Sequence, residues 1–161
     1  MIALKPESVT DTLHIGEATT DQIPQLCELL GELFDQESDF MPDQFKQAAG
    51  LRLVIENPDC GRIFVGRQGT LVVGMINLLI IPSARQGGMG LLFEDLIVKS
   101  DFRGQGIATR LLKHAFEFAC KIGAVQATLL TDDFNEPAAH LYRKMGFSQS
   151  GLSPMRMSLP G

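Results

Sequence analysis

The stretch "SDFRGQGIATRLL", Ser100 to Leu112, places two glycines behind an arginine at the start of an amphipathic helix. Glycine lets the backbone approach a ligand closely, and the first turn of a helix presents unpaired N–H groups at its positive end. A strand, a glycine-rich turn and a helix in this order are typical of an anion site, phosphate above all. Without a ligand, the same stretch is simply a tight turn between a strand and a helix.

Two common phosphate-binding loops do not fit this stretch. The dinucleotide fingerprint needs a third glycine three residues after the second, and Thr109 stands at that place. The P-loop needs Gly-Lys-Ser/Thr after four intervening residues, and nothing here matches it. These two types of loop are therefore excluded, and the molecule that carries the phosphate stays open at this point.

Length and composition are those of one globular domain over residues 1–161, in which we expect residues 1–10 to be a flexible N-terminal segment. Apolar residues make up 45% of the chain and charged residues 20%. No apolar run approaches the ~20 residues of a membrane helix, and the N-terminus lacks the apolar core of a secretory signal. The cysteines are scattered, which predicts neither disulfides nor a metal site and favours a cytoplasmic location.

Charge is unevenly distributed along the chain. The net charge of −5 argues against nucleic acid as the main partner. Acidic residues gather in one short segment that runs from the first predicted helix to the start of the second. This acidic segment is either a solvated helix face or a negative field that attracts a cationic substrate. Its members are Glu28, Glu32, Asp35, Glu37, Asp39 and Asp43.

Apolar periodicity predicts the element order β-α-α-β-β-β-α-β-α-β-β. This order indicates an α/β (α+β) domain built on a mixed, mostly antiparallel central sheet with helices on both faces. The expected strands are 12–18, two in the hairpin 61–81, 91–100, 124–132, 147–152 and 154–159. The expected helices are about 21–33, 42–56, 107–122 and 135–146, and 82–90 is expected to be a flexible loop.

Three motifs together resemble the GNAT superfamily of N-acetyltransferases. The run Arg103–Ala108 matches the pattern Arg/Gln-x-x-Gly-x-Gly/Ala of that family's acyl-CoA pyrophosphate loop. The preceding strand "FEDLIV" is similar to the family's "LEDLYV", and a later helix opens at Asn135 and ends with Tyr142 and a Gly-Phe pair. The branch that contains diamine and polyamine N-acetyltransferases is the most similar.

The resemblance implies the acyl-CoA N-acyltransferase fold and transfer of an acetyl group from acetyl-CoA to a primary amine. The expected acceptor is a small cationic amine such as a diamine or polyamine, attacking directly in a ternary complex. Two alternatives stay open: a non-catalytic acyl-CoA-binding sensor or regulatory module, and an acetyltransferase of protein N-termini or lysines. Members of the family often dimerise, so a homodimer is expected.

The resemblance also implies roles for single residues. Tyr142, the only tyrosine, would be the acid that protonates the leaving thiolate, although it also fits a core aromatic. Glu94 interrupts an apolar strand and would be the base, although it also fits a structural carboxylate. Asp95 should point to the opposite face of the strand, so that only one of the two acids faces a given cleft.

The remaining expected site residues would bind acetyl-CoA, and no metal is expected. Backbone groups of Leu96, Ile97 and Val98 would pair with the pantetheine arm. Arg103, Gly104, Gln105, Gly106, Ile107, Ala108 and Thr109 would hold the pyrophosphate. Asn135, Glu136, Pro137, Ala138 and Tyr142 would line the CoA arm from the later helix, where Asn135 is also a good helix cap.

Overall fold

The computed structural model describes residues 12–34, 43–132 and 135–161. The chain divides into two compact units, Met1–Leu130 and Thr131–Gly161. The expected flexible segment 1–10 and the expected helix start at Pro42 lie outside the described residues. No helix in the described part of the chain is long and apolar enough to cross a membrane.

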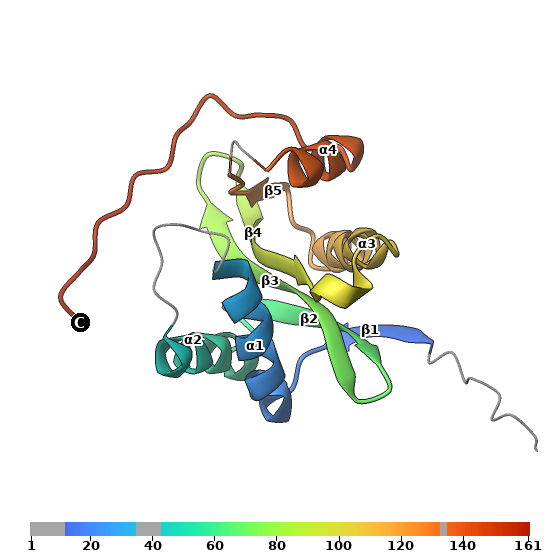
Figure 1. Ribbon diagram of the computed structural model, residues 1–161. Helices are drawn as coiled ribbons and strands as arrows, with labels where there is room; N and C mark the ends of the chain where they lie inside the picture. The colour runs from blue at the N-terminus through green and yellow to red at the C-terminus, as the bar shows by residue number, and fades with distance from the viewer. Residues whose placement is uncertain (1–11, 35–42, 133–134) are drawn as a thin grey trace, which may run out of the picture. The chain divides into compact units, whose positions relative to one another are not determined.

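The first unit is built on a sheet in which the strands follow one another in chain order (Figure 1). Neighbouring strands from β1 to β4 are antiparallel, and β5 runs parallel to β4. The mixed, mostly antiparallel sheet is therefore confirmed. Its strands are β1 (Leu13–Glu17), β2 (Gly61–Gln68), β3 (Leu71–Ser83), β4 (Gly88–Val98) and β5 (Gln126–Leu129).

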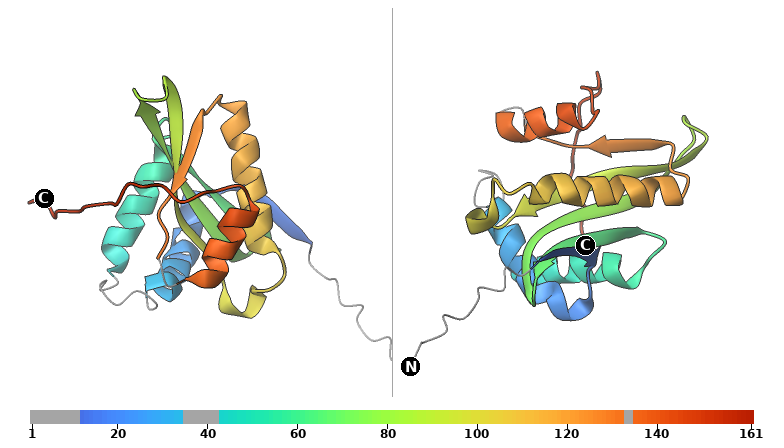
Figure 2. Two further views of the ribbon diagram at one scale, coloured as in Figure 1. Left: turned by 90° about the horizontal axis from the view of Figure 1, so that it is seen from above. Right: turned by 90° about the vertical axis from the view of Figure 1, so that its right-hand side faces the viewer.

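Helices cover both faces of this sheet, as expected (Figure 2). Alternate residues of a strand point to opposite faces of the sheet. The side chains of β2 illustrate packing on each face. Ile63 and Val65 pack in the core that also includes residues of α1 (Ile23–Phe34) and α2 (Gln44–Glu56). Phe64 points the other way, to α3 (Ile107–Lys121), where its ring lies 5.5 Å from that of Phe118.

Local signals explain where two of the helices begin and end. Asp43 caps α2, because its carboxylate accepts hydrogen bonds from the N–H groups of Phe45 (3.0 Å) and Lys46 (3.2 Å). Gly123 adopts a φ of 68° just after α3, which is the left-handed conformation that ends helices. Leu111 and Leu112 on α3 are fully buried, and each such side chain stabilises the fold by roughly 2 kcal/mol.

The hairpin between β3 and β4 is longer than the sequence indicated. The expected loop 82–90 shrinks to a turn at 84–87, closed by a 2.9 Å hydrogen bond from Gly87 N to the carbonyl of Ser83. Pro82 pairs with Met89 inside the ladder. Glycine and proline favour a loop locally, but the long apolar strands extend the pairing past them.

Among its described residues, the second unit contains one helix, α4 (Glu136–Lys144), capped by Asn135, whose side chain accepts from Ala138 N at 3.3 Å. The predicted strands 147–152 and 154–159 are wrong, because residues 147–161 form no strand. A strand needs a hydrogen-bonded neighbour, and the described residues of this unit contain none. Its alternating apolar side chains, Met155, Met157 and Leu159, stay exposed.

Candidate active site

The sheet opens between β4 and β5. The ladder between them runs only from Gly90 to Phe93 of β4, where Phe93 pairs with Leu129. Among the described residues, Glu94–Val98 has no strand beside it on that side, while β3 pairs with its other side. The backbone of Leu96, Ile97 and Val98, expected to bind the pantetheine arm, therefore forms an open edge to which an extended ligand can add.

The glycine-rich loop follows this open edge directly. Gly104 and Gly106 have φ values of 74° and 77°, a conformation that residues with a side chain rarely adopt. Gly106 is the cap residue of α3, and no side chain in the described part of the chain caps this helix. The N–H groups of Ile107, Ala108 and Thr109 thus lie in an uncapped first turn, next to the exposed Gln105.

Arg103 is fastened to both the strand and helix α1. Its Nε donates to the carbonyl of Val98 at 3.0 Å, and its Nη2 lies 4.0 Å from a carboxylate oxygen of Glu32. The same carboxylate accepts from Ser100 N at 3.2 Å and lies 3.8 Å from Lys99 Nζ. Glu32 therefore ties α1 to the loop, a role that the acidic segment did not suggest.

A β-bulge interrupts β4 beside these elements. Asn77 pairs with Glu94 and Met75 pairs with Ile97, so two residues of β4, Asp95 and Leu96, oppose a single residue of β3. Asp95 has a φ of 44°. The bulge breaks the alternation of side chains, and the expectation that Asp95 and Glu94 point to opposite faces is wrong.

Asn77 brings the two acids to the same place. It lies directly opposite Glu94, so the two side chains share a face, and its Nδ2 donates to Asp95 Oδ2 at 3.3 Å. Burial raises the pKa of the Asp95 carboxyl, and the hydrogen bond from Asn77 lowers it in part. Neither Asn77 nor Asp95 was expected in the site. The sequence feature that could have pointed to Asn77 is that it is the one amide in the apolar run "LVVGMINLLII".

The other expected site residues lie in the second unit. Burial raises the pKa of Tyr142, whose ring packs edge-on against Phe147 at 6.1 Å between centroids. Asn135 caps α4, Pro137 lies in its first turn, and Glu136 pairs with Arg143 at 3.9 Å. The cap of Asn135 is confirmed. The CoA contacts of Asn135, Glu136, Pro137, Ala138 and Tyr142 stay predictions.

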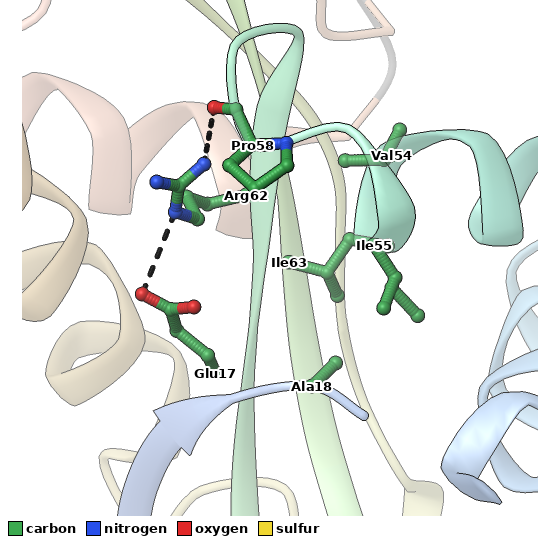
Figure 3. A pocket seen from close by; sticks show the side chains of 7 residues that line it. All are labelled: Glu17, Ala18, Val54, Ile55, Pro58, Arg62 and Ile63. Atoms are coloured by element: carbon green, nitrogen blue, oxygen red, sulfur yellow. Dashed lines mark hydrogen bonds and ion pairs between the residues drawn. The ribbon is translucent and has the colours of Figure 1, made fainter. Parts of the chain in front are cut away.

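A small pocket lies near the start of β2 in the first unit (Figure 3). Its volume is about 30 Å³, and none of the expected site residues lines it. Arg62 crosses its wall, with Nε 3.4 Å from Glu17 and a hydrogen bond to the carbonyl of Pro58. The pocket has room for water-sized groups only, so it does not receive an acyl-CoA.

The chain belongs to the acetyltransferase (GNAT) family, whose model matches residues 23–147. This match includes the open edge of β4, the loop before α3 and helix α4. A possible acetyltransferase from Clostridium difficile 630 shares the fold, with a TM-score of 0.81 at 17% identity over 92% of this chain and 99% of that one. The expected acyl-CoA N-acyltransferase fold is confirmed.

Curated relatives match shorter stretches. Streptothricin acetyltransferase of Streptomyces lavendulae is 44% identical over 62 residues, which are 38% of this chain and 33% of the relative. Thialysine N-epsilon-acetyltransferase of Mus musculus is 37% identical over 79 residues, 49% of this chain and 46% of the relative. The chain therefore spans less than half the length of these relatives, and the branch within the family is not resolved by them.

Proposed function

We propose that this protein transfers the acetyl group of acetyl-CoA to a primary amine. The observation that carries the proposal is the continuous path from the open edge of β4 to the uncapped start of α3. An extended arm that ends in phosphates fits this path, because backbone groups line its first part and helix N–H groups its second. Membership of the GNAT family supports acetyl-CoA as the cosubstrate.

The residues along this path suit the parts of acetyl-CoA. Leu96, Ile97 and Val98 would hold the arm through their backbone. The N–H groups from Gly104 to Thr109 would hold the pyrophosphate, with Arg103 adding positive charge. Acetyl-CoA bound in this way would supply an activated acetyl group at the bulge in β4.

Two side chains supply the proton transfers in this proposal. An alkylamine has a pKa near that of lysine, about 10.4, and must lose a proton before it attacks. Glu94 would take that proton, directly or through water, and Tyr142 would protonate the departing thiolate. The hydroxyl of Tyr142 is protonated at neutral pH, as the second role needs, and burial raises its pKa further.

A small cationic amine is the acceptor that we favour. The chain carries a net charge of −5, and two of the relatives are named for small molecules, streptothricin and thialysine. A diamine or polyamine, the corresponding branch of the family, a homodimer and a cytoplasmic location all belong to this proposal. An acceptor on a protein N-terminus or lysine remains the second candidate.

A thiol-release assay tests the proposal. The protein is mixed with acetyl-CoA and a panel of diamines, polyamines, aminoglycosides, lysine analogues and peptides, and free CoA thiol is followed. Turnover with small cationic amines above the rate without protein is the expected result. Tight acetyl-CoA binding with no turnover on any amine would favour a non-catalytic acyl-CoA sensor instead.

A further inference from the structure

Asn77, which lies beside the bulge in β4, has two polar side-chain atoms, and only one of them has a hydrogen-bond partner among the described residues. An ionised carboxylate only accepts hydrogen bonds, so the Asn77 atom that faces Asp95 must be Nδ2. Asn77 Oδ1 is then left over, and in the described part of the chain it has no hydrogen-bond partner. Asn77 is only 7% exposed, and a buried acceptor without a donor is costly. A donor from outside the chain would remove this cost.

Charge selects the kind of donor. Asp95 is removed from solvent beside Asn77, and Glu94 places a second carboxylate on the same face. Phosphates, carboxylates and thioesters offer only acceptors, so they would leave Oδ1 unpaired and add repulsion. A primary ammonium carries a positive charge and three N–H groups, which can bond to Asn77 Oδ1 and to Asp95 together.

The position of the bulge fits this ligand. The bulge lies where β5 stops pairing with β4. The open edge of β4, which would hold the acetyl-CoA arm, begins at this point. We propose that Asp95 and Asn77 form the subsite that receives the primary amino group of the acceptor and holds it beside Glu94. This inference rests on the proposed acetyl transfer and names the group that selects the acceptor.

Asp95→Asn is the sharpest variant for a test. Asparagine has the same shape, can still accept from Asn77 Nδ2, and is one of the few residues that tolerate a positive φ. The variant therefore removes the charge and keeps the bulge. Asp59→Asn is the matched control, since it removes one carboxylate from an exposed turn between α2 and β2. Asn77→Leu removes Oδ1 together with Nδ2, keeps the branch at Cγ and is a larger side chain.

Two acceptor amines distinguish a loss of charge recognition from a general loss of enzyme activity. Putrescine is cationic at pH 7.5, whereas 2,2,2-trifluoroethylamine is a weak base and is neutral there. In Asp95→Asn, we expect kcat/KM for putrescine to fall about 100-fold, and that for trifluoroethylamine to fall less than about 5-fold. Asn77→Leu should cost about 5- to 10-fold with putrescine. The KM for acetyl-CoA should not change, and Asp59→Asn should behave as wild type.

Equal losses with both amines, or no loss with putrescine in Asp95→Asn, would overturn the subsite. The unfolding temperature of each variant shows whether it has folded. A binding measurement separates this inference from the proposed function: putrescine is titrated into protein that holds a CoA analogue lacking the thiol, and the side-chain amide signal of Asn77 is followed by NMR. We expect a shift in wild type and none in Asp95→Asn.

The two proposals can therefore fail separately. A wild-type shift without turnover on any amine would overturn the proposed function and support the subsite. Wild-type turnover with no shift, and with unchanged kinetics in Asp95→Asn, would overturn the subsite and leave the proposed function standing.

Discussion

Burial keeps the Tyr142 hydroxyl protonated to a higher pH than that of an ordinary tyrosine, which is the state a proton donor needs. For Tyr142→Phe, we expect kcat to fall about 100-fold, because a positioned acid contributes roughly 10²- to 10⁴-fold. Affinity for CoA, measured by calorimetry, should stay within about 2-fold, since phenylalanine keeps the ring contacts. The alkaline decline of kcat due to Tyr142 should lie above pH about 10.

An equal fall in CoA affinity and in kcat would instead show that Tyr142 only packs against its neighbours. His140→Gln provides the control on the same helix. His140 is exposed two residues before Tyr142, and its replacement should leave both quantities unchanged.

Asp95 should reduce the stability of the folded protein at neutral pH. Burial raises its pKa, so the folded state holds this proton more tightly than the unfolded chain does. Stability therefore falls as pH rises from the ordinary carboxyl pKa of about 3.9 through the raised value, and stays lower above it. Asp95→Asn cannot ionise, so at pH 7 it should unfold at a higher temperature than wild type.

The two proteins should converge below pH about 3.9, where Asp95 is protonated in both states. Calorimetric unfolding temperatures across this pH range check the expectation. A lower unfolding temperature for Asp95→Asn at pH 7 would mean that the carboxylate stabilises the fold.

Single residues illustrate what the sequence can predict about the site. Glu94, Arg103 and Tyr142 are proposed as site residues because they stand in motifs with fixed spacing. Asp95 was placed on the wrong face, because period-two alternation holds only in a regular strand and a bulge shifts it by one residue. Glu32 was missed because its contacts lie on a segment 68 residues away in the chain.

At the level of the element, the loop before α3 depends on glycine for its conformation. A Cβ at position 106 would meet no atom within 4 Å, so the cost of Gly106→Ala comes only from the φ of 77°. We expect it to lower the free energy of unfolding by about 1 kcal/mol and to weaken CoA binding. Denaturant titration and calorimetry measure the two effects.

Gly50→Ala is the matched control, and we expect it to change the free energy of unfolding in the opposite direction. Gly50 lies inside α2, also with open space around its Cβ position, and its φ is not in the left-handed region. Alanine there should raise the free energy of unfolding by about 0.5–1 kcal/mol and leave CoA binding unchanged. A stabilising Gly106→Ala would show that the left-handed turn is not needed.

Helices and strands were predictable where the apolar periodicity and the helix caps agreed. They were less predictable where hydrogen bonding to a neighbouring strand decided the structure. The helices α1 and α3 followed from their apolar stripes, α2 from its stop at Asn57, and α4 from its start at the cap residue Asn135. The length of the β3–β4 hairpin and the structure of the residues after Phe147 could not be predicted in this way. A strand is defined by its neighbour as much as by its own sequence. Alternation of Met155, Met157 and Leu159 therefore overpredicted a strand.

At the scale of the whole molecule, the end of the chain should be the first described part that a protease cuts. Residues 148–161 are exposed and form neither helix nor strand, and they include Arg156. Arg110 is also exposed but lies in α3 and donates to the carbonyl of Leu13 at 3.0 Å. Limited trypsin digestion should therefore cut after Arg156 before it cuts after Arg110.

Intact-mass measurement of the early digest checks this order by the appearance of the fragment Met1–Arg156. Early fragments that end at Arg110 would contradict it. The family match spans residues 23–147 and so ends before this site. Loss of the last residues should then leave the described elements unchanged, as circular dichroism of the fragment can show.

The bulge in β4 has a consequence for how members of such a family can differ. It adds one residue to β4, so deletion of Asp95 would restore regular alternation, with Leu96 opposite Ile76 and Ile97 still opposite Met75. Every apolar residue of β4 would keep its side of the sheet, and only the carboxylate would be lost. If Asp95 selects the acceptor as proposed, a one-codon deletion or insertion changes which acceptor such an enzyme takes while its core stays intact.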